Sequence, residues 1–387
     1  MTLSSRLLQA WQRRGPLATL LWPLAQLHGA LLALRRLAYR SGLQSSERLP
    51  VPVLVVGNVV VGGAGKTPTV IALLRHLRAR GWKPGVISRG YGREGEGCLE
   101  VSPDSSSREA GDEPLLIARA TGVPLAVGRR RAEAGRLLLA RHPGIDILVC
   151  DDGMQHWALA RDLTVVVFDE RGCGNGWLLP AGLLREPWPA RAWSREAAGE
   201  LLVLRTTRPD VELSPLPAAQ AGGPVHLARR ELAGEAIDAQ GRRRPLSDFA
   251  RADDGPVAAL AGIAQPQRFF EMLGARGVSL AQALELPDHA DGATLLAALQ
   301  DCQARTAAST PLASPSAAKP AAPSNLRWLC TEKDAVKLFP LLAGQAGLEV
   351  WAVPLEQEPA PEFWHQLDGA LNRLRERLSF PHGRQTA

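Results

Sequence analysis

The sequence is poor in cysteine and in aromatic residues. Its five cysteines are widely spaced, and none forms a Cys-x-x-Cys pair. This pattern predicts neither a disulfide framework nor a structural zinc site, and it favours a reducing compartment. Only 5% of the residues are aromatic, and no zinc-finger or RNA-recognition signature interleaves basic with aromatic positions. Nucleic acid is therefore disfavoured as a partner. We also find no internal repeat.

Length and charge bound the remaining possibilities. With 387 residues, 45% of them hydrophobic, the chain can bury a full core and is long enough for two domains. Its formal net charge of +6 suits an anionic partner such as a phosphorylated substrate, an acidic membrane surface or nucleic acid. Since nucleic acid is disfavoured, an anionic lipid or membrane fits better.

The N-terminal segment is apolar and flanked by arginines. Residues 15–34 contain no charged side chain, which is long enough to consider a membrane span, although Pro16 and Pro23 weaken that interpretation. The flanking basic residues are Arg6, Arg13, Arg14, Arg35, Arg36 and Arg40. We predict a membrane-associating helix within residues 1–45, lying at the interface of an anionic membrane. A span ranks second and a secretory signal last, because no small-residue cleavage site follows. The alternative is that these residues pack on the protein's own core.

A glycine-rich loop follows the apolar run Val53–Val56 and precedes a helical pattern. It comprises Val60, Val61, Gly62, Gly63, Ala64, Gly65, Lys66 and Thr67. Such a loop surrounds nucleotide phosphates with backbone N–H groups, while Lys66 reaches the β/γ oxygens and Thr67 offers a hydroxyl to Mg²⁺. The usual pattern begins with glycine, so Val60 is a departure and an ordinary glycine-rich turn remains the alternative. The prediction is a nucleoside triphosphate site that binds ATP and Mg²⁺.

A second acidic motif supports that prediction. The apolar run Ile147–Cys150 ends in Asp151 and Asp152, an arrangement that holds Mg²⁺ beside a phosphate loop. One carboxylate would bind the metal directly and the other through water, and the sequence does not say which.

Strand-like apolar runs alternate with helical stretches along the chain. This alternation predicts an α/β fold, a mostly parallel P-loop NTPase-like sheet with helices on both faces. The runs are Val53–Val56, Gly85–Ser88, Pro124–Val127, Ile147–Cys150, Leu163–Phe168 and Leu201–Leu204. We predict a kinase core over residues 46–210 and a smaller α/β lobe over 211–387, with strands at Val257–Ile263, Arg327–Thr331 and Leu348–Val353. Residues 304–325 are low in complexity and are predicted to be a disordered insertion.

At this point the motifs resemble those of one family, the tetraacyldisaccharide 4'-kinases of lipid A biosynthesis. The matching segments are GGAGKTP (62–68), SRGYGR (88–93), GDEP (111–114), DDGMQH (151–156), LLREP (183–187), PDH (287–289) and TEKDAVKL (331–338). The resemblance implies transfer of the γ-phosphate of ATP to the 4'-hydroxyl of a tetraacyldisaccharide 1-phosphate, with Mg²⁺. The product would be lipid IVA, formed at the cytoplasmic face of the bacterial inner membrane, with no obligate protein partner.

The resemblance also implies roles for individual residues. Asp112 and His289 would form a catalytic dyad that assists deprotonation of the sugar hydroxyl, with Lys66 stabilising the transferred phosphate. Taken alone, Gly-Asp-Glu-Pro is also turn chemistry. Thr331 would contact the nucleotide. The residues implied in substrate binding are Tyr91, Arg131, Gln155, His156, Arg185 and Glu186. Either Arg129 or Arg130 could replace Arg131, and Arg185 with Glu186 could be a surface ion pair.

This chain differs from the family's usual pattern in two places, and a rival function has to be considered. The family usually continues its PDH segment with a second histidine and an aromatic residue, whereas this chain has Ala290 and Asp291; residues 304–325 resemble an insertion. The rival is a membrane-attached ATPase switch, whose loop usually carries a second lysine where this chain has Val61. A nucleotide-binding scaffold without turnover is a third reading. Acceptor dependence distinguishes the first two, because a kinase consumes ATP only when its acceptor is present.

Overall fold

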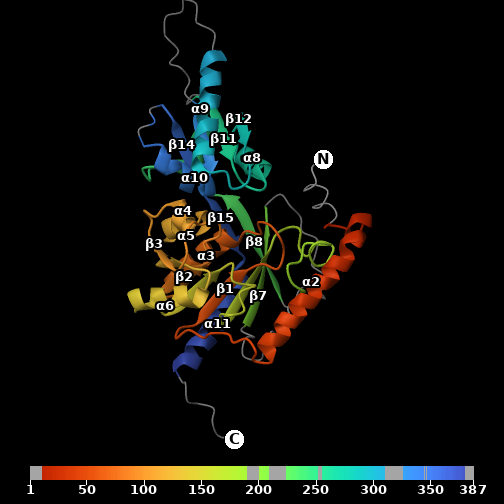
Figure 1. The fold of residues 1–387 in the computed structure, drawn as a ribbon. Helices are drawn as coiled ribbons and strands as arrows, with labels where there is room; N and C mark the ends of the chain where they lie inside the picture. Colours follow the sequence, from red (N-terminus) through yellow and green to blue (C-terminus); the bar gives the residue numbers. More distant parts are fainter. Residues whose placement is uncertain are drawn as a thin grey trace, which may run out of the picture. The chain divides into compact units, whose positions relative to one another are not determined.

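The computed structural model describes residues 11–189, 200–208, 224–251, 255–309, 326–343, 345 and 347–379. The chain divides into two compact units (Figure 1). The first unit contains the described residues of Met1–Ser105, Ile117–Arg230 and Gln357–Ala387, and the second those of Ser106–Leu116 and Glu231–Glu356. The predicted boundary at residue 210 therefore differs from the structure, because the chain enters and leaves the second unit twice.

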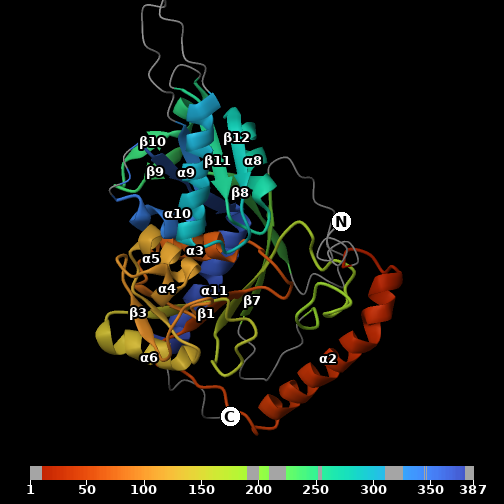
Figure 2. The same ribbon diagram turned by 45° about the horizontal axis from the view of Figure 1, so that its top comes forward.

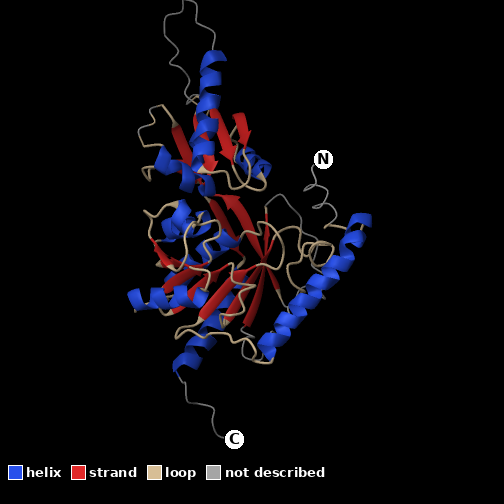
Figure 3. Cartoon of the chain, in the orientation of Figure 1, coloured by secondary structure: helices blue, strands red, loops and turns tan. Residues whose placement is uncertain are grey.

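The first unit is built on a nine-stranded sheet with the order β15-β8-β7-β6-β1-β5-β2-β4-β3. Strands are drawn in red and helices in blue in Figure 3. The strands of the sheet are β1 Val53–Gly57, β2 Pro84–Ser88, β3 Leu99–Val101, β4 Leu125–Val127, β5 Ile147–Asp151, β6 Leu163–Phe168, β7 Glu200–Thr207, β8 Val225–Leu232 and β15 Leu355–Pro359. From β4 to β8 every neighbouring pair is parallel, whereas β3 runs antiparallel to β4. Every residue of β1, β2, β5 and β6 is buried, as expected for parallel strands covered on both faces. The predicted α/β fold class is confirmed.

Helices cover the sheet of the first unit. Helix α3 (Lys66–Ala79) contacts β1, β2 and β5, and α6 (Arg131–Arg141) contacts β2, β3 and β4. Leu138 of α6 shares an apolar cluster with Val53 and Val55 of β1. The alternate residues Leu54 and Val56 are buried as well and point to the opposite face. Both faces of the strand that precedes the glycine-rich loop are therefore held in place.

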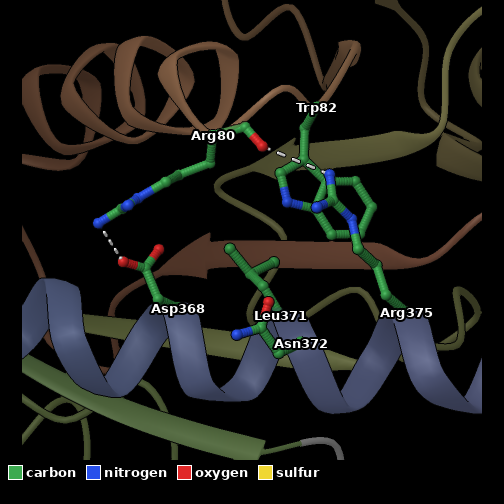
Figure 4. A pocket seen from close by; sticks show the side chains of 6 residues that line it. All are labelled: Arg80, Trp82, Asp368, Leu371, Asn372 and Arg375. Atoms are coloured by element: carbon green, nitrogen blue, oxygen red, sulfur yellow. Dashed lines mark hydrogen bonds and ion pairs between the residues drawn. The ribbon is translucent and has the colours of Figure 1, made fainter.

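The C-terminal helix α11 (Pro361–Ser379) also belongs to the first unit. Its Asp368 pairs with Arg80 at 2.7 Å and with His76 at 2.7 Å. The guanidinium of Arg375 lies 4.0 Å from the ring centre of Trp82. A small pocket where α11 meets the end of α3 is lined in part by Arg80, Trp82, Asp368 and Arg375 (Figure 4). The prediction that residues 211–387 form one C-terminal lobe is wrong for this helix.

The second unit contains a six-stranded sheet with the order β10-β9-β14-β13-β11-β12. Its strands are β9 Glu235–Asp238, β10 Arg243–Pro245, β11 Val257–Ala261, β12 Leu280–Glu285, β13 Arg327–Thr331 and β14 Glu349–Val353. Its helices are α8 Pro266–Ala275, α9 Gly292–Ser309 and α10 Glu332–Leu338, with 3₁₀ turns η1 Leu246–Ala250 and η3 Phe339–Leu341. Ala259 packs with Phe270 of α8, whereas the next residue, Leu260, packs with Leu299 of α9. Alternate residues of the central strand thus supply two cores, one on each face.

Two short helices lie where the chain first enters the second unit. Helix α4 (Ser107–Ala110) is capped by Ser106, whose hydroxyl accepts a hydrogen bond from the Glu109 N–H at 3.3 Å. Gly111 separates it from α5 (Asp112–Thr121) with φ +88°, a conformation that glycine adopts without strain. Asp112 therefore begins a helix.

The described residues include only the first part of the predicted insertion over 304–325. Residues 304–309 form the last turns of α9, so the prediction of disorder is wrong there. The remainder, 310–325, lies outside the described residues.

Helix α2 (Pro16–Arg40) lies at one side of the first unit (Figure 2). Many of its large apolar side chains are exposed. Its Ala18 and Ala25 are buried, and His28 Nδ1 lies 3.1 Å from the Leu179 carbonyl oxygen. The exposed leucines recur at helical spacing: Leu17, Leu20, Leu24, Leu27, Leu31, Leu34 and Leu37. By length and composition the helix could cross a membrane. The two buried residues of the helix are thus alanines, while a row of leucines is exposed, the reverse of an ordinary surface helix.

Candidate active site

The glycine-rich loop occupies the turn between β1 and α3. Gly65 caps α3 with φ +83°, and Gly62 has φ +94°. A Cβ atom at Gly65 would lie 3.2 Å from Gln357 Oε1 as well as being strained. Lys66 is the first residue of α3, so the glycine-rich loop leads directly into the N-terminus of a helix. This is the geometry that binds phosphate.

Val60, which departs from the usual glycine, is a core residue. Its side chain is 0% exposed and packs with Met154 and Leu184. The neighbouring backbone pairs with the Leu183–Arg185 segment, because Val61 N–H donates to Leu183 O at 3.0 Å and Arg185 N–H to Val59 O at 2.7 Å. The valine therefore anchors the start of the loop, and only its backbone remains for a ligand.

Lys66 lies between two oxygen-bearing side chains. Its Nζ is 3.3 Å from Asn58 Oδ1 and 3.5 Å from Asp152 Oδ1, and its side chain is 12% exposed. Asn58 itself is fully buried and donates to Gly62 O at 3.3 Å. Both lysine contacts are long for charge-assisted hydrogen bonds. Asn58 was missed as a site residue, although Gly57-Asn58 directly precedes the loop.

The two aspartates after β5 meet the loop at the carboxyl edge of the sheet. Val56 of β1 is in register with Asp151 of β5. Asp151 is 1% exposed, and its Oδ2 accepts a hydrogen bond from Ser88 Oγ at 3.1 Å. Asp152 adopts a left-handed backbone with φ +46°, which is uncommon for a residue other than glycine. The adjacent strands thus bring both carboxylates to the loop.

The oxygen-bearing side chains beside the loop are of the kind that bind Mg²⁺ next to a nucleotide. Within the described part of the chain, no group of three or more His, Cys, Asp or Glu side chains could hold a metal ion. Mg²⁺ prefers oxygen ligands, and beside phosphate loops it takes only one or two carboxylates, with substrate phosphates and water completing the shell. Asp151, Asp152 and the Thr67 hydroxyl offer such a partial oxygen set.

A buried glutamate stands next to this cluster. Gln155 Nε2 donates to Asn58 O at 2.9 Å and to Glu186 Oε1 at 2.7 Å. Glu186 is 0% exposed, and burial raises its pKa to about 7. Arg185 instead faces Asp152, with Nη1 3.8 Å from Oδ1. Arg185 and Glu186 therefore have separate partners at the site and are not a surface ion pair.

Arg161 organises the DDGMQH loop, and sequence reasoning missed it. This arginine is 4% exposed and donates to three backbone carbonyls, those of Gly153 at 3.4 Å, Met154 at 3.1 Å and His156 at 3.1 Å. Burial lowers the pKa of His156 to about 4, and nearby arginines, Arg131 first, add to the effect. A basic residue just before a strand carries no local signal that it is buried.

The structure separates Arg131 from its neighbours. Arg131 begins α6, is 5% exposed and donates to Arg129 O at 3.0 Å, whereas Arg129 and Arg130 are exposed. Of the three arginines, Arg131 is therefore the one that is buried and held in place by a hydrogen bond. Tyr91, in the turn after β2, is 70% exposed.

Arg171 is a further residue at the loop that the sequence did not indicate. It donates to the Val61 carbonyl at 3.0 Å and pairs with the buried Asp169 at 2.8 Å. Its guanidinium lies 3.2 Å from where a Cβ on Gly62 would stand. The loop is thus held by a side chain that follows β6, the other neighbour of β1.

In the second unit, Asp112 and His289 come together as predicted from the resemblance. His289 Nδ1 lies 3.8 Å from Asp112 Oδ2. His289 has φ +64° and donates its N–H to Gly262 O at 3.3 Å. Its ring also lies 3.9 Å from Asp288 Oδ2. The histidine therefore stands on a strained turn with an acid on each side.

A lysine and a second aspartate complete this cluster. Lys337 is 5% exposed at its side chain, and its Nζ lies 3.6 Å from Asp112 Oδ2 and 3.7 Å from Asp334 Oδ1. Thr331 caps α10, its hydroxyl donating to Asp334 Oδ2 at 2.6 Å and accepting from Asp334 N–H at 3.2 Å. The structure gives Thr331 this helix-capping role, and its predicted nucleotide contact stays a prediction.

Comparison with known proteins identifies the family. The model of the tetraacyldisaccharide-1-phosphate 4'-kinases matches residues 17–372. The chain belongs to this kinase family. It is similar to the tetraacyldisaccharide 4'-kinase of Acidovorax sp. (strain JS42), 51% identical over 372 residues and covering 96% of both chains. The corresponding enzyme of Polaromonas naphthalenivorans (strain CJ2) is 50% identical over 380 residues, with 98% of each chain covered.

A solved structure of the tetraacyldisaccharide 4'-kinase family shares the fold. The crystal structure of the "apo" form of LpxK from Aquifex aeolicus in complex with ATP has a TM-score of 0.70 and 27% sequence identity. The match covers 92% of this chain and 99% of that one. The family resemblance seen in the sequence is confirmed.

Proposed function

We propose that this chain transfers the γ-phosphate of ATP to the 4'-hydroxyl of a tetraacyldisaccharide 1-phosphate, forming lipid IVA. The observation that carries the proposal is Lys66, which stands at a left-handed glycine cap between Asn58 and Asp152. In phosphoryl transfer, catalysis comes mainly from positioning and from stabilising the charge on the transferred group. The loop N–H groups and Lys66 supply both to the nucleotide.

The acceptor oxygen forms the new bond to the γ-phosphorus while the bond to the β-phosphate oxygen breaks and ADP leaves. A sugar hydroxyl is a weak nucleophile, so a base for its proton accelerates the step. We assign that role to Asp112, with His289 orienting the carboxylate. This assignment is supported by the contact of 3.8 Å between the two side chains.

Thr67, Asp151 and Asp152 are the residues that would hold Mg²⁺. When bound, the ion would neutralise charge on the nucleotide phosphates. The chain's own contribution is the Ser88 hydrogen bond to Asp151, which orients that carboxylate.

The remaining polar residues are assigned to the acceptor and the nucleotide. Arg131 and Arg185 provide positive charge for the 1-phosphate or the triphosphate. Gln155, which is half-buried and hydrogen-bonded to the buried Glu186, can orient sugar hydroxyls. His156 and Tyr91 are assigned to the acceptor and Thr331 to the nucleotide, on the family resemblance alone.

Helix α2 is assigned to the membrane that holds the acceptor, at the cytoplasmic face of the inner membrane. Leu20 is 75% exposed, Leu27 60% and Leu34 63%, and burying each leucine in lipid contributes about 1.5–3 kcal/mol. We expect the Leu20, Leu27 and Leu34→Ser triple variant to lose co-sedimentation with anionic phospholipid vesicles. Leu43→Ser, exposed beyond the helix, should bind as the wild type does. Equal binding of all three proteins would contradict the assignment.

The test of the central proposal is transfer of radiolabelled phosphate from ATP to purified disaccharide 1-phosphate in detergent. We expect a product with a 4'-phosphate and ATP consumption only when the acceptor is present. Slow ATP hydrolysis without acceptor, and no labelled lipid, would instead favour the ATPase switch.

A further inference from the structure

Lys337 is a buried cation inside the Asp112 cluster. It lies within the TEKDAVKL segment, but neither the sequence analysis nor the proposed mechanism gives it a role. Its side chain is only 5% exposed, and its Nζ donates to the Ala290 carbonyl at 2.6 Å. It also faces Asp112 Oδ2 at 3.6 Å and Asp334 Oδ1 at 3.7 Å. A buried ammonium is costly unless it is paired and hydrogen-bonded, and these three partners satisfy it.

The contacts of Lys337 converge on the turn that carries His289. Ala290, whose carbonyl the lysine binds, directly follows the histidine. On the other side, His289 N–H donates to Gly262 O at 3.3 Å, while Gly262 N–H donates to Asp334 Oδ2 at 3.0 Å. Asp334 in turn faces Lys337. The strained backbone of His289, with φ +64°, is therefore held on both sides by one connected network.

The lysine also orients Asp112. Lys337 Nζ and His289 Nδ1 both face the same carboxylate oxygen, Oδ2. The attraction of the Lys337 ammonium favours the carboxylate orientation that keeps Oδ2 toward it. The other oxygen, Oδ1, is then the one we assign to the proton of the acceptor hydroxyl.

We propose that Lys337 is a positioning residue for the Asp112–His289 pair. This inference rests on the proposed function, because it assumes that Asp112 takes the acceptor proton. Lys337 acts through the carboxylate and through the His289 turn, and it does not touch the reacting atoms. Its removal should lower kcat and leave the KM for ATP unchanged, since the phosphate loop is built from other residues.

The test is a double-mutant cycle of Lys337→Met with Asp112→Asn, using the full chain and the phosphate-transfer assay. We expect Lys337→Met to lower kcat by roughly tenfold or more. In the Asp112→Asn background the same change should cost less than about threefold, because its target is already lost. Lys337→Arg, which keeps the charge, should recover part of the kcat.

The outcomes separate the two proposals. If Asp112→Asn alone leaves kcat unchanged, the proposed function of Asp112 fails whatever Lys337 does. If Asp112→Asn lowers kcat but Lys337→Met lowers it equally in both backgrounds, or mainly raises the KM for ATP, the positioning role of Lys337 is overturned.

Folding is checked by thermal unfolding of each variant. Should Lys337→Met fail to fold, Lys337→Gln replaces it in the same cycle, because glutamine can still donate to the Ala290 carbonyl while lacking the charge. The criteria are the same as for Lys337→Met. A kcat loss seen only while Asp112 is present supports the proposal, and an equal loss in the wild-type and Asp112→Asn backgrounds contradicts it.

Discussion

Two lysines are held in different ways: Lys66 of the first unit, which is partly buried, and Lys337 of the second, which is buried. Lys66 lies 3.3 Å and 3.5 Å from its two side-chain partners. Lys337 instead donates to a backbone carbonyl at 2.6 Å and faces two carboxylates. Long contacts can be exchanged for a phosphate at little cost, whereas a short bond to buried backbone cannot. This difference supports the two proposals, that Lys66 binds the nucleotide phosphates and that Lys337 positions Asp112.

The clusters around the two lysines also differ in how the chain builds them. The phosphate-loop cluster uses segments that follow neighbouring parallel strands, so short motifs and the sheet order bring it together. The second cluster joins the start of α5, Gly262, the turn at His289 and α10. These segments are far apart in the sequence, and no local pattern indicates that they meet.

The sharpest test of the comparison is Lys66→Ala. We expect roughly a 10³-fold loss of kcat, because a preorganised positive charge on the transferred phosphate disappears. Steady-state phosphate transfer measures it, with the exposed Lys83→Ala as the matched control. Near-wild-type turnover of Lys66→Ala would remove Lys66 from the reaction.

Asp112→Asn should have a smaller effect. Asparagine keeps the shape of the side chain but cannot accept the acceptor proton, so we expect a loss of about 10²-fold in kcat with measurable activity remaining. The exposed Asp104→Asn is the control and should be unaffected. A loss as large as that of Lys66→Ala would contradict the ranking of the two clusters.

Arg161→Lys tests whether the DDGMQH loop depends on the hydrogen bonds that Arg161 donates to its backbone. Lysine keeps the charge but cannot reach the carbonyls of Gly153, Met154 and His156 together. Loosening the loop that carries Asp152 and Gln155 should lower kcat/KM by about tenfold. Unchanged kcat/KM in a folded variant would show that the loop does not need this support.

The smallest expected effect concerns stability against pH. The folded-state pKa of Glu186 is raised to about 7, so its contribution is full below its usual value of 4.5 and is lost as the pH rises to about 7. The pKa of His156 is lowered from 6.5 to about 4, so its contribution is lost as the pH falls through that range. As the pH falls, Glu186 therefore raises the free energy of unfolding while His156 lowers it.

Replacing either Glu186 or His156 should therefore reveal the pH dependence of stability that the other side chain contributes. Glu186→Gln should lose more unfolding free energy than the wild type on acidification from pH 7 to 4.5, and His156→Asn should show the reverse. Each unit of pKa difference corresponds to about 1.4 kcal/mol. Chemical denaturation at several pH values measures the effect, and parallel curves for all three proteins would rule out the buried charges as its cause.

Much of the fold followed from local patterns. The buried strands β1, β5 and β6 are apolar runs of branched residues, and each was predicted to within a residue or so. The polar-looking strands β8, β12 and β15 were not predicted, because more and less exposed positions alternate along them and they contain charged residues. Helix α11 was placed in the wrong unit, since nothing in its own sequence shows that Asp368 pairs with Arg80.

By itself the sequence determined the phosphate loop, the paired aspartates after β5 and the family. These depend on residues adjacent in the chain, where glycine, lysine and carboxylate chemistry leaves few alternatives. Only the tertiary structure decided that Val60 is a core residue, that Glu186 is buried beside Gln155, and that Lys337 stands between Asp112 and Asp334. Burial and long-range pairing arise from how distant segments pack, and a residue's type alone does not encode them.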